Sequence, residues 1–193
     1  HGSGEGSLPI HTQGYVAFLQ DFLARRRIRS VVDMGCGDWQ FSRFVDWTGI
    51  DYHGFDVVPS VISANVAAFQ RAGRQFHLYG GDAKDLPAAD LLITKDVLQH
   101  LDDATVLDFL RSLSKYEYAL LTNCVDPAGP TRHVNIQTGG FRYLDLRLPP
   151  FNLGAELVYE FSRCDLPGEV PSVQPAWHKQ VLLVQGMGPR SVN

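Results

Sequence analysis

The sequence predicts an α/β fold, in which a mostly parallel sheet carries helices on both faces. Short apolar runs typical of buried strands alternate along the chain with segments whose apolar residues recur at helical spacing. Four of these runs end in polar or small residues, at the edge where an open parallel sheet places its ligand. With 193 residues, of which 45% are hydrophobic, the chain fits a single domain over residues 1–193 with a sizeable core.

The chain opens with a glycine-rich run, H-G-S-G-E-G-S, and residues 1–11 are expected to be flexible. This segment is either a linker or tag remnant, or a lid that orders over a bound ligand. A helix is expected from Thr12 to about Arg27, with Thr12 as its N-cap and three arginines at its C-terminal end. These arginines suit a solvated helix end better than a nucleic-acid contact. The apolar stripe of this helix is Tyr15, Phe18, Leu19, Phe22 and Leu23.

The stretch from Ser30 to Phe44, S-V-V-D-M-G-C-G-D-W-Q-F-S-R-F, organises the predicted fold. An apolar pair ends in Asp33, and Gly35 and Gly37 follow, which is typical of a buried strand that enters a tight turn. Glycines let a ligand approach the backbone, because no Cβ stands in the way. The phosphate-binding G-x-x-x-x-G-K-[ST] spacing is absent, and G-x-G-x-x-G is incomplete because residue 40 is Gln. A helix packed on the sheet is expected over residues 40–45.

Strand-like and helical segments then alternate as far as residue 125. Pro59 suits the first turn of one helix and Gly73 ends it, while Asp102 or Asp103 can cap a later one. The expected strands are Tyr52–Val58, Phe76–Tyr79, Asp90–Thr94 and Tyr118–Val125, and the expected helices are Ser60 to about Arg71 and residues 102–114.

Acidic or small residues lie at the ends of these strands. Asp56 is at the tip of the second strand, about 20 residues after Gly35, where an acid binds the ribose hydroxyls in nucleotide-binding α/β folds. The third strand leads into G-G-D-A, which contains Asp82, and the fourth leads into Lys95 and Asp96. Since the carboxyl ends of parallel strands meet at one edge, these residues are expected to converge.

Composition excludes several classes of protein. A net charge of −4 argues against a nucleic-acid-binding surface, and no apolar run approaches the roughly 20 residues that span a membrane. The cysteines, Cys36, Cys124 and Cys164, are widely spaced and odd in number. We interpret them as reduced thiols of a cytoplasmic protein, and expect neither a disulfide framework nor a zinc site.

Four ordered motifs resemble those of class I S-adenosylmethionine-dependent methyltransferases: V-V-D-M-G-C-G-D-W, G-F-D-V-V-P-S-V-I, G-G-D-A-K-D-L-P and D-L-L-I-T-K-D-V-L-Q-H-L. The resemblance covers about half of the chain, from Val31 to Val125, and depends on the order and spacing of the motifs. It implies a Rossmann-like sheet of seven strands, closed by an antiparallel hairpin of Leu157–Phe161 and Gln180–Val184. It also implies S-adenosylmethionine as cofactor, with S-adenosylhomocysteine as product.

The resemblance assigns roles to individual residues. Asp33 would lie near the methionine ammonium of the cofactor, Asp56 would bind the ribose hydroxyls and Asp82 the adenine amino group. Lys95 and Asp96 would face the methionine and the reacting centre. Trp39 either caps the methionine end of the pocket or packs under the first helix. The implied cofactor-binding residues are Asp33, Gly35, Gly37, Trp39, Asp56, Val57, Asp82, Ala83, Lys95 and Asp96.

A methyl acceptor loses a proton during transfer, so a base is useful, and Asp96 and His100 are the candidates. Asp96 is nearer to the site on topology, whereas His100, on a helix that would begin at Asp96, can also be a packing or surface residue. Some relatives hold a magnesium ion with acids after the fourth and fifth strands. Here Thr122 replaces the second acid, so no metal site is expected.

Residues 126–154 are rich in Pro, Gly and polar residues, and are too long for an ordinary connection. We interpret them as a substrate-recognition insert beside the methyl end of the cofactor. Its candidate substrate residues are Arg132, His133, Arg142 and Tyr143. The expected activity is methyl transfer to a small-molecule or glycan-like acceptor by a monomer or homodimer. The alternatives are a protein or nucleic-acid methyltransferase, and a non-catalytic cofactor-binding module.

Overall fold

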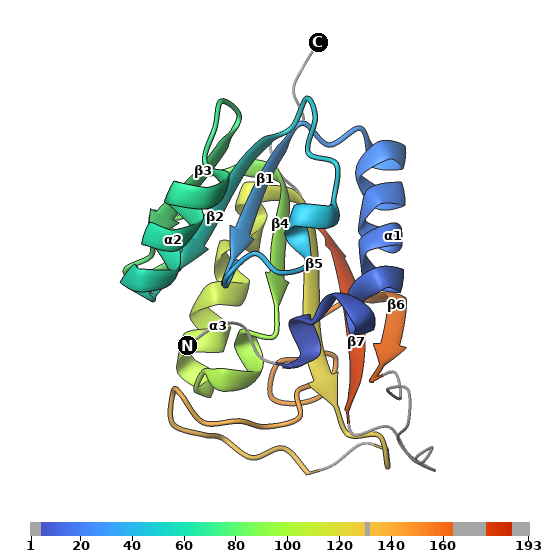
Figure 1. The fold of residues 1–193 in the computed structure, drawn as a ribbon. Helices are drawn as coiled ribbons and strands as arrows, with labels where there is room; N and C mark the ends of the chain where they lie inside the picture. Colours follow the sequence, from blue (N-terminus) through green and yellow to red (C-terminus); the bar gives the residue numbers. More distant parts are fainter. Residues whose placement is uncertain (1–4, 130–131, 164–176, 187–193) are drawn as a thin grey trace.

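The computed structural model describes residues 5–129, 132–163 and 177–186. They form a seven-stranded sheet in the order β3-β2-β1-β4-β5-β7-β6 (Figure 1). Strands β1 to β5 pair in parallel, whereas β7 is antiparallel to both β5 and β6. The predicted Rossmann-like sheet with a C-terminal antiparallel pair is confirmed. The strands are β1 Ser30–Met34, β2 Asp51–Asp56, β3 Arg74–Leu78, β4 Ala89–Lys95, β5 Tyr116–Val125, β6 Glu156–Ser162 and β7 His178–Gln185.

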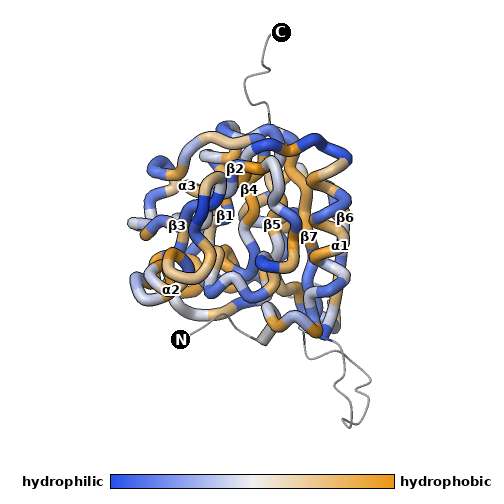
Figure 2. The backbone as a smooth tube through the Cα atoms, turned by 45° about the horizontal axis from the view of Figure 1, so that its top comes forward, coloured by the Kyte–Doolittle hydropathy of each residue, from blue (hydrophilic) through white to orange (hydrophobic). Residues whose placement is uncertain are grey.

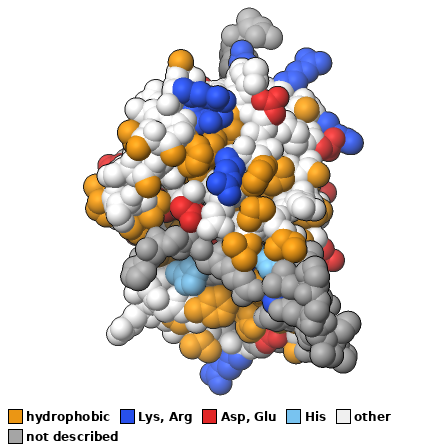
Figure 3. All heavy atoms as spheres, in the orientation of Figure 1, with side chains coloured by type: hydrophobic (Ala, Val, Ile, Leu, Met, Phe, Trp, Pro, Cys, Tyr) orange, Lys and Arg blue, Asp and Glu red, His pale blue; other side chains and the backbone are white. Residues whose placement is uncertain are grey.

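Two hydrophobic clusters, one on each face of the sheet, form the core. Alternate residues of a strand point to opposite faces, so Val31 belongs to one cluster and Val32 to the other. Helices α1, Pro9–Arg26, and α2, Pro59–Phe69, pack on the first cluster, and α3, Asp103–Arg111, packs on the second. Figure 2 shows hydrophobic colour along the central strands, and Figure 3 shows further hydrophobic side chains on the surface over α2. Helices on both faces are thus confirmed.

Two predicted helical segments are 3-10 turns instead. The helix expected over residues 40–45 is only η2, which ends where Val45 takes an extended conformation, with a φ of −83° and a ψ of 136°. Likewise Asp96 has a φ of 61°, so His100 lies on the turn η4 rather than on a helix that begins at Asp96. The 3-10 turns are η1 Glu5–Ser7, η2 Ser42–Phe44, η3 Ala83–Asp85, η4 Leu98–His100 and η5 Ser112–Lys115.

The first helix begins earlier than predicted. It starts at Pro9, whose fixed φ suits a first turn, and Leu8 occupies the cap position without a side-chain hydrogen bond. The prediction of Thr12 as N-cap is wrong, because its hydroxyl lies inside the helix and donates to the carbonyl of Leu8 at 3.0 Å. Of the segment predicted to be flexible, residues 1–11, the turn η1 and the first residues of α1 occupy the described part. Residues 1–4 lie outside the described part of the chain.

The insert over residues 126–154 forms neither helix nor strand in its described part. Backbone hydrogen bonds attach it to the site side of the sheet, from Gly139 to the carbonyl of His100 at 2.8 Å and from Leu144 to that of Cys124 at 2.8 Å. Leu146 is fully buried in the second core cluster. The insert is thus held at several points along its length.

The described helices include none with the length and apolarity that crossing a membrane requires. Of the cysteines, Cys36 and Cys124 are buried free thiols, and Cys164 lies outside the described residues.

Candidate functional site

A cleft of about 1240 Å³ lies where the carboxyl ends of the first four strands meet. This is the point at which the strand order reverses, between β1 and β4, and open α/β sheets bind their ligands at such a point. Each of the four loop tips contributes, so the predicted convergence is confirmed. The lining includes Gly35 and Gly37 after β1, Asp56 and Val57 after β2, Asp82 and Ala83 after β3, and Lys95, Asp96 and Val97 after β4.

The turn after β1 requires its glycines. Gly35 has a φ of 80° and Gly37 a φ of 55°, both in the left-handed region that side chains disfavour. A Cβ on Gly35 would also lie 2.2 Å from the Cγ2 of Val97. The backbone therefore approaches both its neighbour and the cleft more closely than any other residue type allows.

Asp56 ties the first two loop tips together. Its Oδ2 accepts a hydrogen bond from the backbone N–H of Gly37 at 3.0 Å, and its Oδ1 accepts one from that of Val58 at 3.0 Å. These contacts fix the orientation of the carboxylate. Each carboxylate oxygen has a second lone pair, so Asp56 keeps two acceptor positions for a ligand in the cleft.

Asp33 lies behind the cleft wall rather than on it. The residue is 3% exposed, and its Oδ2 accepts a hydrogen bond from the hydroxyl of Tyr52 at 2.6 Å. Burial raises the pKa of this carboxyl to about 6, although the hydrogen bond from Tyr52 and the charge of Lys95 oppose the shift. Asp33 is thus a buried acid whose charge is costly without a nearby cation.

Asp33→Asn is expected to remove a pH dependence of stability. The folded pKa of about 6 exceeds the ordinary value of 3.8, so the folded protein holds this proton more tightly than the unfolded chain. The stabilisation is complete below about pH 4 and is lost as the pH rises through 6, at about 1.4 kcal/mol per pKa unit and about 3 kcal/mol in total. Urea unfolding at pH 4.5 and 7.5 captures about 2 kcal/mol of this loss, because the unfolded carboxyl is already mostly ionised at pH 4.5. The expectation would be contradicted if the free energy of unfolding changed equally with pH in the Asp33→Asn variant and in the unaltered protein.

Trp39 is a core residue and not part of the cleft lining. It is 1% exposed, and its ring packs against Phe69 and Phe76 on the α1 and α2 side of the sheet. Its Nε1 donates a hydrogen bond to the hydroxyl of Tyr52 at 2.9 Å. Trp39 therefore does not cap the methionine end of the cleft, which was one of the two predictions. The other prediction placed it under a first helix, but its ring packs against α2 and β3 instead, and the segment after it is only the turn η2.

Three charged side chains form a buried group at the ends of β4 and β7. The Oδ2 of Asp96 accepts from the ammonium of Lys95 at 2.7 Å and from that of Lys179. The two lysine side chains are 3% and 4% exposed. Burial would raise the pKa of Asp96, but the two ammonium charges hold it below its usual value. Asp96 is therefore a carboxylate at neutral pH and a weak base.

Sequence reasoning missed Lys179. It joins the group because β7 runs antiparallel to β5, so that Lys179 lies opposite Cys124 at the carboxyl edge of β5. The N-terminal turn η1 belongs to the same group. Lys95 donates to the carbonyl of Gly6 at 3.1 Å and to the hydroxyl of Ser7 at 3.2 Å, and Ser7 lines the cleft. No short motif marks these positions.

His100 reaches the cleft lining from η4. Its Nδ1 lies 2.7 Å from the carbonyl oxygen of Gly140, which accepts hydrogen bonds but cannot donate them. Nδ1 must therefore carry a proton, and in the neutral ring Nε2 is the basic nitrogen. The ring of Phe141 packs against the imidazole at 5.7 Å. The insert thus fixes both the position and the tautomer of His100.

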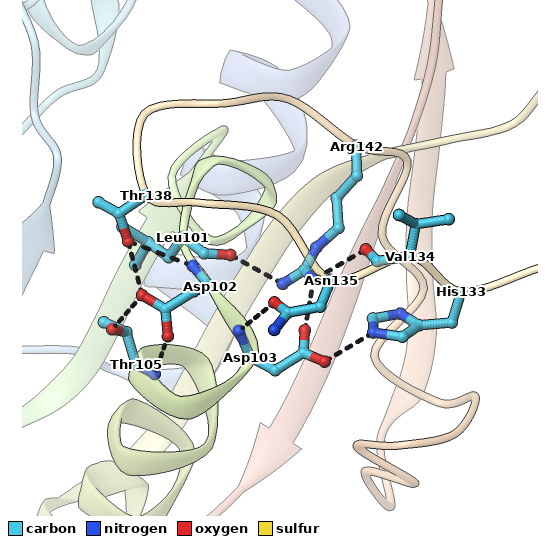
Figure 4. A network of polar contacts seen from close by, with 9 residues as sticks. All are labelled: Leu101, Asp102, Asp103, Thr105, His133, Val134, Asn135, Thr138 and Arg142. Carbon is cyan, nitrogen blue, oxygen red and sulfur yellow. Dashed lines mark hydrogen bonds and ion pairs between the residues drawn. The ribbon is translucent and has the colours of Figure 1, made fainter.

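The insert is fastened to the start of α3 by a network of polar contacts (Figure 4). Asp103 accepts hydrogen bonds from Arg142 and from the Nε2 of His133 at 2.8 Å. Arg142 also donates to the carbonyl of Leu101 at 2.8 Å. Arg142 and His133, predicted to bind substrate, point into this network and do not line the cleft. Their loop is long enough to fold back on α3, where a carboxylate stabilises both side chains.

Other residues of the insert do line the cleft. They are Thr138 and Gly139, of which Thr138 donates to Asp102, the N-cap of α3, at 2.7 Å. The remaining predicted substrate residues, Arg132 and Tyr143, are exposed and lie outside the lining. The insert therefore borders the cleft through Thr138 and Gly139, and not through the four residues predicted to bind substrate.

Among the described residues, no group of three His, Cys, Asp or Glu side chains is placed to hold a metal ion.

Neither a protein-family model nor a curated protein sequence matches the chain. Solved structures do match it in fold. The magnesium protoporphyrin IX methyltransferase ChlM of Synechocystis PCC 6803, solved with bound S-adenosylhomocysteine, is 15% identical, with a TM-score of 0.61 over 96% of this chain and 90% of that one. The methyltransferase domain of bacterial CtHen1-C is 14% identical, with a TM-score of 0.62 over 91% and 98%.

A methyltransferase from Archaeoglobus fulgidus that depends on S-adenosylmethionine is 16% identical, with a TM-score of 0.55 over 88% of this chain and 94% of that one. At these identities the similarity concerns the fold. The chain has the Rossmann-like fold of class I S-adenosylmethionine-dependent methyltransferases, and the resemblance of its motifs is confirmed at that level.

Proposed function

We propose that the chain is an S-adenosylmethionine-dependent methyltransferase that acts on a small-molecule or sugar-like acceptor. The observation that carries the proposal is the convergence of four loop tips on one cleft, with the carboxylate of Asp56 fixed by Gly37 and Val58. The fold shared with solved methyltransferases supports it, and one of those structures contains S-adenosylhomocysteine.

The cleft residues divide among the parts of the cofactor. Asp56 accepts hydrogen bonds from the ribose hydroxyls, with Val57 beside it, and Asp82 accepts from the adenine amino group next to Ala83. Gly35 and Gly37 let the methionine part approach the backbone. Asp33, behind this wall, compensates the positive charge of the ligand from within the core. Its raised pKa supports this role, because a cation in the cleft stabilises the ionised carboxylate.

Chemistry at the methyl end requires little from the protein. The cofactor supplies a methyl group on a sulfonium, which is already activated for attack. The chain must orient the acceptor and exclude water. Ser7, Lys95 and Asp96 line the cleft there, and Lys179 pairs with Asp96 behind them.

His100 is the better candidate for the base. It lines the cleft, and its Nε2 is free of a proton in the neutral ring. Asp96 also lines the cleft, but two ammonium groups lower its pKa and so weaken it as a base. We assign Asp96 to the organisation of the site and His100 to removal of the acceptor's proton.

Calorimetry with S-adenosylmethionine and S-adenosylhomocysteine tests the proposal, and binding in the micromolar range is expected for each. Methyl-labelled cofactor is then incubated separately with small hydroxyl, amino and carboxyl compounds, with free sugars, with protein and with RNA and DNA. Label in a small molecule or sugar supports the proposed acceptor class, and label in protein or nucleic acid replaces it. Binding without transfer to any acceptor would indicate a non-catalytic module, and no binding would end the proposal.

A further inference from the structure

A second cavity, of about 440 Å³, lies at the opposite edge of the sheet from the cleft. Two turns form it, the one that precedes β2 over residues 47–50 and the one that precedes β3 over residues 71–73. Figure 3 shows basic side chains at this end of the molecule, near the turn that Figure 1 places between α2 and β3. Arg71 and Arg74 are both in the lining.

Arg74 is buried, and no acidic side chain of the described residues pairs with it. The residue is 8% exposed, and its Nε has no hydrogen-bond partner within the described part of the chain. Its guanidinium lies 4.3 Å from the ring centroid of Trp39. Buried charges are normally paired, because an unpaired one loses its hydration without compensation. Contact with an aromatic face replaces only part of that hydration.

Arg71 adds a second positive charge at the same place. The two arginines form an antiparallel backbone bridge. The N–H of Arg71 donates to the carbonyl of Arg74 at 3.1 Å, and the N–H of Arg74 donates to the carbonyl of Arg71 at 2.9 Å. Directly opposed residues of such a bridge send their side chains to the same side. Burial, followed by the charge of Arg71, lowers the pKa of Arg74. The fold thus places two like charges together.

The nearest acidic residues are engaged elsewhere. Asp51 lines the cavity, but its Oδ2 lies 3.2 Å from the Nε2 of His53. Asp46 accepts hydrogen bonds from Thr48 and feels the charge of Arg71 only weakly. Neither forms an ion pair with Arg74 or Arg71 in the described structure. A guanidinium matches the two oxygens of a carboxylate or phosphoryl group, so an anion would complete this arrangement.

We propose that this second cavity binds a small oxyanion, a phosphoryl or carboxylate group, between Arg74 and Arg71. Trp47 forms part of its wall and Trp39 lies beneath the guanidinium of Arg74. Occupancy therefore changes the surroundings of two indoles, which provides a signal independent of any catalytic activity.

Titration of the full chain with inorganic phosphate and, separately, with acetate tests this, using calorimetry and tryptophan fluorescence at constant ionic strength. Saturable binding of at least one anion, at one site and with a fluorescence change, is expected. Tighter binding of phosphate would identify a phosphoryl ligand, and tighter binding of acetate a carboxylate. The proposal would be overturned if neither phosphate nor acetate bound saturably at concentrations up to about 50 mM, which is 50-fold above about 1 mM.

Two variants locate the site. Arg74→Met is expected to weaken binding at least tenfold, since it keeps the volume but removes the guanidinium, and Arg71→Gln several-fold. Arg25→Gln, on the exposed surface of α1, is the matched control and should bind as the unaltered protein does. If the Arg74→Met variant does not fold, the anion affinity of the Arg71→Gln variant is the test of the proposal. Equal affinity in Arg71→Gln and the unaltered protein, as expected for an anion bound in the main cleft, would overturn the proposal.

Discussion

Asp56→Ala is expected to weaken the binding of S-adenosylhomocysteine by at least about 100-fold. Hydrogen bonds to a charged acceptor contribute about 1.5–3 kcal/mol each, and the ribose offers two. The substitution also frees the backbone N–H groups of Gly37 and Val58, which the carboxylate holds in place at 3.0 Å each. The loop tips after β1 and β2 would then lose their common anchor. Isothermal titration calorimetry measures the change.

Asp51→Ala is the matched control, because it removes an exposed carboxylate from the other end of the same strand. It should leave the affinity for S-adenosylhomocysteine within about twofold of the unaltered protein, less than 0.5 kcal/mol. An Asp56→Ala protein that binds as tightly as the Asp51→Ala protein would place the ribose elsewhere. The assignment of the remaining loop tips would then need revision as well.

Asp96→Asn is expected to lower the free energy of unfolding by about 3–5 kcal/mol. The substitution leaves the ammonium groups of Lys95 and Lys179 without the carboxylate they share, while their side chains remain 3% and 4% exposed. Breaking a buried pair costs more than breaking a surface pair, because the remaining charge stays out of water. Urea unfolding of the two proteins at pH 7.5 measures this loss in the free energy of unfolding.

The Lys179→Met variant tests whether the stability of this group depends on its charge balance or on its packing. It leaves one ammonium, that of Lys95, with one carboxylate, that of Asp96, and should cost much less than Asp96→Asn. Losses of equal size in the two variants, or a loss below about 1 kcal/mol in Asp96→Asn, would contradict the view that both lysines are charged in the folded protein.

The parts of the fold that sequence predicted are those set by local patterns. The strands were predictable because their apolar runs are bounded by turn residues, and the site edge because polar residues follow four strand ends. The conformation of the segment after Gly37 could not be predicted from sequence, because the left-handed φ of Trp39 depends on the core in which its indole is buried. A tryptophan near a glycine turn has no sequence signal that separates a pocket wall from a buried anchor.

The charged residues of the site show the same limit. Arg142 in a long polar loop suggests a substrate contact, and only the folded chain shows Asp103 beside it. Lys179 lies far along the chain from Asp96, and an antiparallel strand brings the two together. Which charges pair is decided by tertiary contacts, and these have no fixed spacing in sequence.

The hydrogen bonds to Gly6 have a practical consequence for biochemists. Two lysines hold its carbonyl, at 3.1 Å from Lys95 and 3.4 Å from Lys179, so the turn Glu5–Ser7 is a structural component of the cleft wall. Limited proteolysis or truncation that removes this turn would expose both ammonium groups to water. Ligand-binding measurements on a chain that lacks this turn would therefore describe an altered site.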